Sequence, residues 1–269
     1  MIKFTKNFYQ KGVRKKVISL GLDSGSSMTK AVLFKDDHII KAKMIPTSIS
    51  PRKSLEELYL DMINEKERID VVVTTGYGRN LLEQADFKIT EITCHAAGAF
   101  FMNPDCNTII GGQDSKVITI DDLGCVTDFL MNDKCAAGTG RFLEMTMKRV
   151  ESEIDKIDIF VKDAKPAKIN SMCAVFAESE IVGLLAQDIP PEDIVLGCVE
   201  SICQRTAAFA QKLAPVNPKV FFSGGLAQFD VMKQSLARHL RIKEVATDPL
   251  CQYTGAIGAA VLGIQKKKR

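Results

Sequence analysis

The stretch VISLGLDSGSSMTKAVLF, residues 17–34, joins two apolar, β-rich runs through a turn of glycine and serine. The segment DDHIIKAKMIP, residues 36–46, predicts a third strand, with Asp36 and Asp37 in the turn before it. The stretch NTIIGGQDSKVITIDDLGCVTDFLMN, residues 107–132, has the same order of strand, glycine turn, strand, turn and strand. The chain therefore contains one supersecondary unit twice, without repeating its sequence.

The glycine turns of these two units are suited to phosphate. In DSGSSMTK, residues 23–30, backbone N–H groups, hydroxyls and Lys30 can meet phosphate oxygens, and Asp23 is placed to bind Mg²⁺ through water. GGQDSK, residues 111–116, stands at the equivalent point of the second unit, so two facing turns would clamp a polyphosphate. Either turn alone also fits an ordinary structural hairpin, and the pair is the more specific signal.

A third turn, Ser223-Gly224-Gly225, lies between an expected strand and an expected helix, where a nucleotide base or ribose can lie against backbone. An ordinary strand-to-helix turn is the alternative. The chain has no Walker A loop. Three glycine turns on two β-meander units indicate the α/β fold of actin, hexokinase and heat-shock-chaperone ATPases. We expect a first lobe of residues 1–98 and 253–269 and a second lobe of residues 99–252.

Apolar periodicity and turn residues predict the remaining elements. Ser54 is expected to cap a helix that runs to Glu67, with Glu57 in the capping-box position. Further helices are expected over residues 91–102, 139–150, 175–186, 191–214, 229–240 and 253–264. Short strands are expected over residues 70–75, 219–223 and 243–246.

Eight cysteines in a chain that does not start with an apolar signal segment indicate a reducing, cytoplasmic location. Cys135 and Cys173 each stand just before an expected helix, whose N-terminus would lower the pKa of the thiol. Two such thiolates are half of the ligands of a [4Fe–4S] cluster, and a two-fold homodimer would supply the other half. Spacing alone favours buried structural cysteines, which is our interpretation of the other six, Cys94, Cys106, Cys125, Cys198, Cys203 and Cys251.

The net charge of +3 comes from the two ends of the chain. Residues 1–16 hold six basic and no acidic residues, and residues 266–269 hold four more basic ones. Without these ends, 26 basic residues stand against 33 acidic ones, so the body of the chain is acidic and nucleic acid is not an expected partner. No apolar run approaches the ~20 residues of a membrane span, so no membrane partner is expected either.

Eight segments resemble the activator ATPases of 2-hydroxyacyl-CoA dehydratases, a family that includes benzoyl-CoA reductase ATPase subunits and reductases of double-cubane cluster proteins. These segments are GLDSGSSMTK, TGYGR, EITCHAAGA, GGQDSKV, FLMNDKCAAGTGRFLE, SMCAVFAESE, SGGLAQ and TGAIGAA. The resemblance implies a homodimer with one [4Fe–4S] cluster at the subunit interface, held by Cys135 and Cys173 of each chain. It also implies ATP-driven transfer of a low-potential electron to an iron–sulfur dehydratase or reductase, with flavodoxin or ferredoxin as the electron source.

The resemblance assigns the other site residues by position. It places Mg²⁺ and hydrolysis with Asp23, Gln113 and Asp114. It places the phosphates of ATP with Ser26, Ser27, Met28, Thr29, Lys30, Gly111 and Gly112. It places the rest of the nucleotide with Gly138, Thr139, Gly140, Glu144 at the ribose, and Gly224, Gly225 and Gln252 at the base.

One position departs from the family pattern. The second phosphate turn usually reads Asp-Ile-Gly-Gly-Gln-Asp, with the first Asp orienting Mg²⁺ or the attacking water, and here Ile109 occupies its place. This departure predicts slower hydrolysis than in relatives with the aspartate. Two other functions stay open: a small-molecule kinase of the same fold with Asp114 as base, and a hydrolysis-impaired nucleotide-binding regulator. The cysteine segments argue against the kinase.

Overall fold

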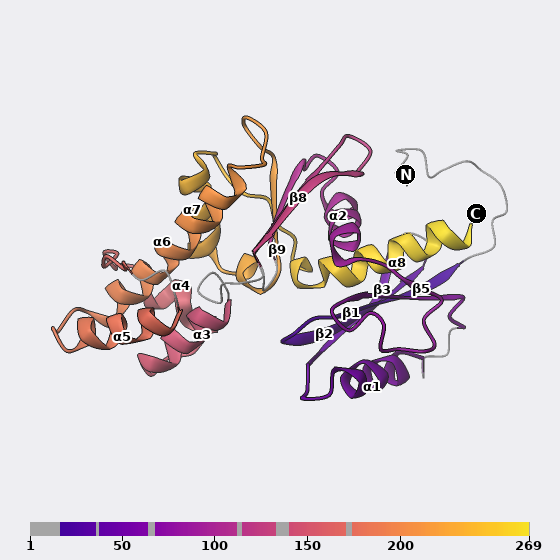
Figure 1. Ribbon diagram of the computed structural model, residues 1–269, viewed down its shortest axis with the longest axis horizontal. Helices are drawn as coiled ribbons and strands as arrows, with labels where there is room; N and C mark the ends of the chain where they lie inside the picture. The colour runs from indigo at the N-terminus through magenta and orange to yellow at the C-terminus, as the bar shows by residue number, and fades with distance from the viewer. Residues whose placement is uncertain are drawn as a thin grey trace. The chain divides into compact units, whose positions relative to one another are not determined.

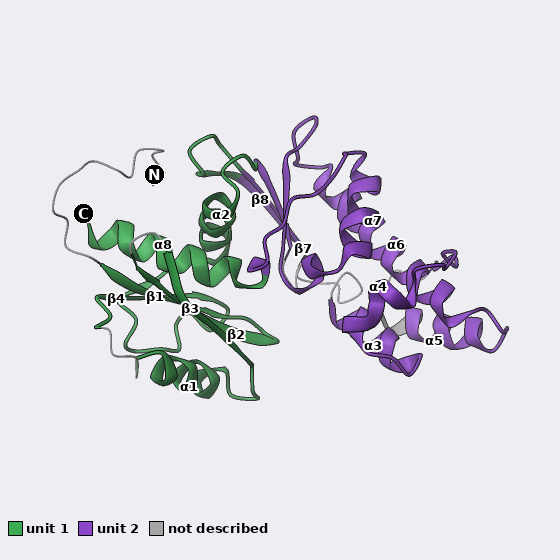
Figure 2. Ribbon diagram, turned by 180° about the vertical axis from the view of Figure 1, so that it is seen from behind, with its two compact units in different colours: residues 1–106, 120–127, 252–269 green, residues 107–119, 128–251 purple. Residues whose placement is uncertain are grey.

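The computed structural model describes residues 17–35, 38–63, 68–111, 115–132, 140–170 and 174–268 (Figure 1). The chain divides into two compact units, each of which contains one β-sheet (Figure 2). Unit 1 comprises residues 1–106, 120–127 and 252–269, and unit 2 comprises residues 107–119 and 128–251. In the described part of the chain, no helix is both long and apolar enough to cross a membrane.

The sheet of unit 1 has the strand order β3-β2-β1-β4-β5. Its strands are β1 (Ile18–Ser24), β2 (Met28–Lys35), β3 (His38–Pro46), β4 (Val71–Gly76) and β5 (Phe87–Lys88). The first three form the antiparallel meander that the sequence predicted, and β4 pairs in parallel with β1. The predicted turn at Asp36 and Asp37 lies outside the described residues.

The described residues of unit 1 form three helices: α1 (Pro51–Ile63), α2 (Glu91–Met102) and α8 (Thr254–Lys267). The sequence predicted the bounds of α2 as the structure has them. In the structure, Thr90 is the N-cap, and its side chain accepts a hydrogen bond from the Thr93 N–H. The boundary expected at residue 98 falls inside α2, whereas the structure keeps this whole helix in unit 1.

The expected start of α1 was wrong. This helix begins at Pro51, because proline suits the first turn of a helix, where its missing N–H is not needed. Ser54 is therefore inside the helix, buried, and its hydroxyl accepts a hydrogen bond from the Ser48 N–H at 2.8 Å. The end predicted at Glu67 lies outside the described residues.

The sheet of unit 2 has the order β8-β7-β6-β9. Its strands are β6 (Thr108–Gly111), β7 (Ser115–Ile120), β8 (Val126–Asn132) and β9 (Val220–Ser223). Strand β6 pairs antiparallel with β7 and parallel with β9, just as β1 pairs with β2 and β4. The supersecondary repeat that the sequence predicted is thus confirmed. The strand expected over residues 243–246 was wrong, since only Ala246 forms a bridge, to Phe221.

The helices of unit 2 are α3 (Gly140–Arg149), α4 (Ile157–Phe160), α5 (Ala174–Leu185), α6 (Pro191–Ala210) and α7 (Asp230–Leu240). Short 3-10 turns are η2 (Ile154–Lys156), η3 (Gly225–Gln228) and η4 (Cys251–Tyr253), the last spanning the unit boundary. The apolar face of α6, with Val195, Val199 and Ile202, is buried in the core of unit 2.

Two polar contacts fix the place of α7. The Asp158 carboxylate of α4 accepts hydrogen bonds from the backbone N–H groups of Asp230 and Val231, at 3.0 and 2.8 Å, and so caps α7 from 72 residues away. On α6, the Glu200 carboxylate accepts hydrogen bonds from Ser235 and His239 of α7, at 2.9 and 2.8 Å, and pairs with Arg238. The first contact holds the start of α7 and the second its last turns.

Replacing Glu200 with alanine is expected to lower the free energy of unfolding by about 2 kcal/mol at neutral pH, because three donors lose their acceptor. Partial burial acts to raise the pKa of Glu200, but the hydrogen bonds from Ser235 and His239 and the charge of Arg238 outweigh it and hold the pKa below 4.5. This stabilisation is therefore present above pH 4.5 and is lost as the pH falls through the lowered value.

Urea unfolding at several pH values measures this effect. The difference in unfolding free energy between the wild type and Glu200→Ala should become smaller towards acid pH. The control variant Glu244→Ala, at an exposed position after α7, should have the unfolding free energy of the wild type at every pH. Equal unfolding free energies of Glu200→Ala and the wild type at pH 7 would show that the contact with α7 contributes nothing to stability.

Candidate functional site

Three polar residues stand side by side across the sheet of unit 1. Asp23 on β1 is in register with Lys30 on β2 and with Thr75 on β4. Residues in register on neighbouring strands point to the same face of a sheet. The row Lys30–Asp23–Thr75 therefore shares one face, near the end of β1 and β4 where ligands bind in open α/β sheets.

The carboxylate of Asp23 lies in a slot between two glycines. Its Oδ1 is 2.7 Å from the point that a Cβ on Gly76 would occupy, and its Oδ2 is 2.6 Å from the equivalent point on Gly255. Gly76 also has φ of +82°, which L side chains rarely adopt. A side chain at either glycine would push the carboxylate away, so both glycines are required for the present position of Asp23.

The Asp23 side chain suits a cation. Asp23 is only 5% exposed, and among the described residues no hydrogen bond or ion pair to its carboxylate is found. Gly255 places the carboxylate at the first turn of α8, where the positive end of the helix dipole favours an anion. A buried carboxylate without a charged partner is costly, and Mg²⁺ prefers such oxygen ligands. These residues therefore fit the Mg²⁺ that the sequence placed here.

The turn between β1 and β2 is built by its own hydrogen bonds. The Gly25 N–H donates to Met28 O at 3.2 Å, and Thr47 donates from its N–H to Ser27 O at 2.8 Å and from its hydroxyl to Gly25 O at 2.9 Å. Ser26 and Ser27 are exposed at the tip. Thr29 is buried against the Thr47 hydroxyl, 2.9 Å away, so its side chain supports the turn from behind.

The remaining residues assigned to phosphate belong to β2 of unit 1 or to the end of β6 and the turn after it in unit 2. Lys30 and Met28 are half-buried on β2, and Gly111 ends β6. Gly112, Gln113 and Asp114 lie outside the described residues.

Ile109 lies inside β6 and is 1% exposed. Its register neighbours are Ile118 on β7 and Phe221 on β9. The register neighbours of Asp23 in unit 1 are a lysine and a threonine, whereas both register neighbours of Ile109 in unit 2 are apolar. No described residue in this row of unit 2 can therefore hold a cation.

The third turn follows β9. Gly224 has φ of +90°, and its N–H donates to Cys251 O at 2.9 Å, while the Cys251 thiol donates back to Gly224 O at 3.6 Å. A Cβ on Gly225 would meet no atom within 4 Å, so this glycine faces open space. The backbone at Gly225 is thus accessible to a flat ligand, and the base site at this turn stays a prediction. Gln252 follows Cys251 directly and is half-buried.

The two predicted cluster ligands, Cys135 and Cys173, lie outside the described residues, as do Gly138 and Thr139. Gly140 begins α3, and Glu144 is exposed one turn later. Among the described residues, no group of three or more His, Cys, Asp or Glu side chains could hold a metal.

Four other cysteines are poor ligands. Burial raises the pKa of the thiols of Cys94, Cys106, Cys198 and Cys203 to about 12. A cluster is ligated by thiolates, so these four are expected to remain uncharged core residues. Cys251 is also buried, and Cys125 is half-buried in the β7–β8 turn. The structural interpretation of these cysteines agrees with their burial.

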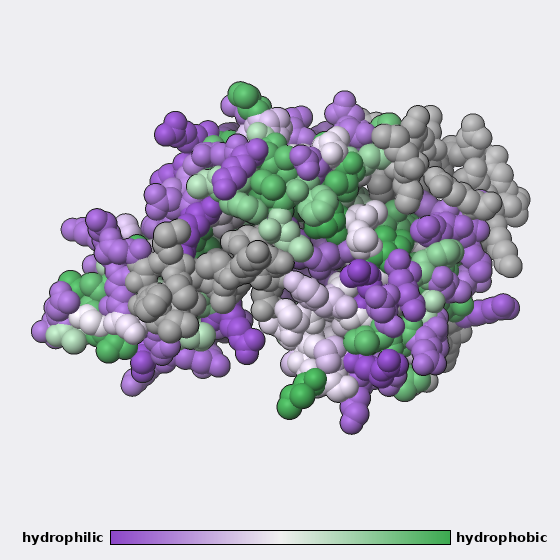
Figure 3. All heavy atoms as spheres, viewed as in Figure 1, coloured by the Kyte–Doolittle hydropathy of each residue, from purple (hydrophilic) through white to green (hydrophobic). Residues whose placement is uncertain are grey.

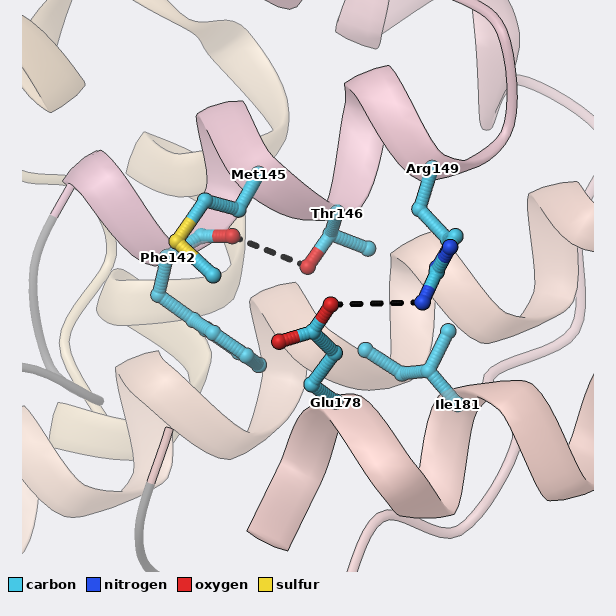
Figure 4. Close-up of a pocket in the computed structure, with 6 residues that line it drawn as sticks. All are labelled: Phe142, Met145, Thr146, Arg149, Glu178 and Ile181. Carbon is cyan, nitrogen blue, oxygen red and sulfur yellow. Dashed lines mark hydrogen bonds and ion pairs between the residues drawn. The ribbon is translucent and has the colours of Figure 1, made fainter. Parts of the chain in front are cut away.

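The helices that follow the two cysteine segments in the sequence, α3 and α5, are neighbours in space (Figure 4). Phe142 and Ile181 are buried between them, and Arg149 pairs with Glu178 at 3.3 Å across the groove. The Thr146 hydroxyl is satisfied by Phe142 O at 2.9 Å. The groove is lined by Phe142, Met145, Thr146, Arg149, Glu178 and Ile181. Two elements more than twenty residues apart in the sequence thus form one helix pair.

Sequence reasoning missed three residues of the site: Thr75, Gly76 and Gly255. They surround Asp23 only because β4 pairs in parallel with β1 and α8 packs onto the same strand. The signal was present, since the segments TGYGR and TGAIGAA were noted without any role. A fourth neighbour is His95, whose Cε1 lies 3.0 Å from the Cβ point of Gly255 and whose Nδ1 donates to Glu91 O at 2.9 Å.

Comparison with known proteins identifies the relatives of this chain. The model of the BadF/BadG/BcrA/BcrD ATPase family matches residues 20–263. The (R)-2-hydroxyglutaryl-CoA dehydratase activating ATPase of Acidaminococcus fermentans is 38% identical over 258 residues, which cover 93% of this chain and 98% of that protein. The resemblance to activator ATPases seen in the sequence is thereby confirmed.

Solved structures show similarity to the same group of proteins. The activator of the 2-hydroxyisocaproyl-CoA dehydratase from Clostridium difficile, with bound ADPNP, superposes with a TM-score of 0.85 at 37% identity, covering 94% of this chain and 96% of that one. A ROK family glucokinase from Streptomyces griseus, at 12% identity, has a TM-score of 0.61 and covers 92% of this chain and 99% of its own. The predicted hexokinase-like ATPase fold is confirmed.

Proposed function

Because this chain belongs to the BadF/BadG/BcrA/BcrD ATPase family, we propose that it is an ATP-driven iron–sulfur electron donor. It would use ATP binding and hydrolysis to pass a low-potential electron to a partner iron–sulfur enzyme. Flavodoxin or ferredoxin would supply one electron, the acceptor would take one, and ATP and water would yield ADP and phosphate. The relatives named above are an activating ATPase and an activator of 2-hydroxyacyl-CoA dehydratases, which makes such a dehydratase the first acceptor to test.

The slot around Asp23 is the observation that carries the ATP part of this proposal. A buried carboxylate held between Gly76 and Gly255, without a charged partner among the described residues, would hold hydrated Mg²⁺. The exposed turn at Ser26 and Ser27, with Lys30 beside Asp23, would bind the phosphates.

We assign the other nucleotide contacts to unit 2. Gly111, Gly112, Gln113 and Asp114 would form the second phosphate turn, and Gly138, Thr139, Gly140 and Glu144 would contact the sugar and phosphates. The open backbone at Gly225, next to Gly224, supports a base site here, and the family resemblance assigns Gln252 to the same base. Asp114 or Gln113 would orient the attacking water.

The electron would be carried by a [4Fe–4S] cluster shared by two copies of the chain. Cys135 and Cys173 of each copy would ligate it, because four of the other cysteines are buried thiols with a raised pKa. When bound, the cluster supplies a site for one low-potential electron. The acidic residues of the chain's body do not compete for this role, since thiolates are the preferred ligands.

An apolar surface next to the cysteine segment supports the homodimer. Phe129 and Met131 on β8 are 47% and 38% exposed, and hydrophobic residues gather over β8 on the face drawn in Figure 3. Met131 precedes Cys135 by only four residues, so this strand must lie close to any contact that Cys135 makes with a second copy.

Iron and acid-labile sulfide analysis of the anaerobically purified protein, together with its ATPase rate, tests the proposal. We expect about four iron atoms per two chains, since one [4Fe–4S] cluster would be shared by the dimer. Dithionite reduction should then give an EPR signal. An iron-free protein that still hydrolyses ATP would exclude an electron donor and favour a kinase or a regulator.

Ile109 favours a second candidate, a nucleotide-binding regulator with impaired hydrolysis, because its neighbours in the sheet are apolar. Replacing Ile109 with aspartate is expected to raise ATP turnover about tenfold, by supplying the carboxylate that orients Mg²⁺ or water in the family pattern. Steady-state phosphate release measures the change. Ile109→Asn is the matched control, since it introduces a polar group of similar size without the charge.

If folded Ile109→Asp, with a normal far-UV circular dichroism spectrum, turns over ATP no faster than the wild type, the alignment of the second phosphate turn is wrong.

A further inference from the structure

Two neighbouring threonines of β4 differ in the hydrogen bonds that their hydroxyls make. Thr74 and Thr75 are both fully buried. The Thr74 hydroxyl donates to Arg79 O at 2.7 Å and so holds the turn after β4. Among the described residues, the Thr75 hydroxyl meets no group in good hydrogen-bond geometry, and its side-chain contact is with the Cys94 thiol. A buried hydroxyl without a partner costs free energy, so its retention at this position calls for another reason.

Thr75 faces Asp23. The two residues are in register on the parallel strands β1 and β4, which places their side chains on one face of the sheet. The Cys94 thiol on α2 lies near both residues: burial raises its pKa, a hydrogen bond with Thr75 acts to lower it, and the Asp23 charge acts to raise it. The thiol is no adequate partner for the hydroxyl: burial raises its pKa to about 12, and a neutral thiol is a weak hydrogen-bonding group.

The end of β4 is shaped around Asp23 in two further ways. Gly76, which follows Thr75, leaves room for Asp23 Oδ1. The Gly78 N–H donates to Ser24 O at 3.2 Å and ties the next turn to the end of β1. Thr75 therefore belongs to the part of unit 1 that holds Asp23 in place.

We propose that Thr75 is a positioning residue of the cation site. With Mg²⁺ and nucleotide bound, its hydroxyl donates a hydrogen bond to the Asp23 carboxylate and fixes the direction in which that carboxylate holds the hydrated cation. This inference rests on the ATP part of the proposed function. It does not involve the cluster, so it can be tested without reference to electron transfer.

The test is the binding of Mn²⁺, used in place of Mg²⁺, to the purified protein at saturating ADP. The EPR signal of free Mn²⁺ measures how much of the ion remains unbound. Thr75→Val removes the hydroxyl and keeps the shape of the side chain, and we expect it to weaken Mn²⁺ binding about tenfold. Thr75→Ser keeps the hydroxyl and should bind Mn²⁺ as the wild type does.

The melting temperature separates this role from a structural one. Loss of a hydroxyl whose one partner in the described part of the chain is a weakly hydrogen-bonding thiol should change the melting temperature of Thr75→Val little, while Mn²⁺ binding falls. Ser19→Ala is the matched control: the Ser19 hydroxyl is also buried and without a partner among the described residues, but it lies four residues away from Asp23 on β1. This variant should bind Mn²⁺ normally.

Unchanged Mn²⁺ affinity in folded Thr75→Val would overturn the inference. So would an equal loss of affinity in Thr75→Ser, because the hydroxyl would then not be the group that matters. If the wild type itself binds no Mn²⁺ with ADP, the proposed nucleotide function fails and the inference with it. If only the inference about Thr75 is wrong, the wild type still binds Mn²⁺ in the presence of ADP.

Discussion

Replacing Asp23 with asparagine is expected to slow ATP hydrolysis by about a hundredfold to a thousandfold, since the variant would lose the charge that we propose holds Mg²⁺ at the phosphates. Asparagine has the same shape as aspartate, so it should fit between Gly76 and Gly255 without disturbing the sheet. The loss should therefore appear in catalysis and in Mg²⁺ affinity and not in the melting temperature. Phosphate release at saturating ATP, measured over a range of Mg²⁺ concentrations, gives both quantities.

Asp61→Asn is the control for Asp23→Asn. Asp61 lies on α1 and pairs with Lys43 at 2.9 Å, in the same unit but away from the β1–β2 turn. Its ATPase rate should equal that of the wild type. If Asp23→Asn also hydrolyses ATP at the wild-type rate, the slot around Asp23 is not the cation site, and the phosphates must be held elsewhere.

Replacing Cys135 or Cys173 with alanine is expected to reduce bound iron from about four atoms per two chains to background. In the proposed homodimer each substitution would remove two of the four ligands, because a two-fold dimer presents each cysteine twice. The absorbance of the cluster and the EPR signal after reduction should disappear together with the iron. ATP binding should persist, since the groups around Asp23 are untouched.

Cys125→Ala serves as the matched control, because Cys125 is half-buried in the β7–β8 turn and its thiol is the least enclosed of the described cysteines. It should keep its full iron content. Iron that survives in both Cys135→Ala and Cys173→Ala would show that other residues ligate the cluster.

The parts of the fold that were predictable from the sequence are those set by local pattern. Helix α2 begins and ends as expected from its run of small and apolar residues, and the Thr90 side chain caps its start. Both β-meanders follow from short apolar runs separated by glycine or aspartate turns. Helix α6 was predicted too long by four residues, since its last expected turn, after Ala210, is not helical.

The parts that could not be predicted depend on contacts between distant residues. Helix α4 has only four residues, too few for an apolar period, and the capping role of its Asp158 depends on α7, 72 residues later. The walls of the Asp23 slot, Gly76 and Gly255, come together through parallel pairing and helix packing. A cation-binding role for Asp23 could be proposed from its motif, whereas the glycines around its carboxylate could be identified only from the fold.

The coupling of ATP to the cluster is the central claim. The EPR spectrum of the anaerobically purified, dithionite-reduced protein, recorded with and without saturating Mg·ATP, tests it most directly. We predict an iron–sulfur signal whose shape or g-values change when Mg·ATP is added to the wild type and stay unchanged in Asp23→Asn. A signal that is identical with and without Mg·ATP, or a protein without iron that hydrolyses ATP at full rate, would contradict the claim.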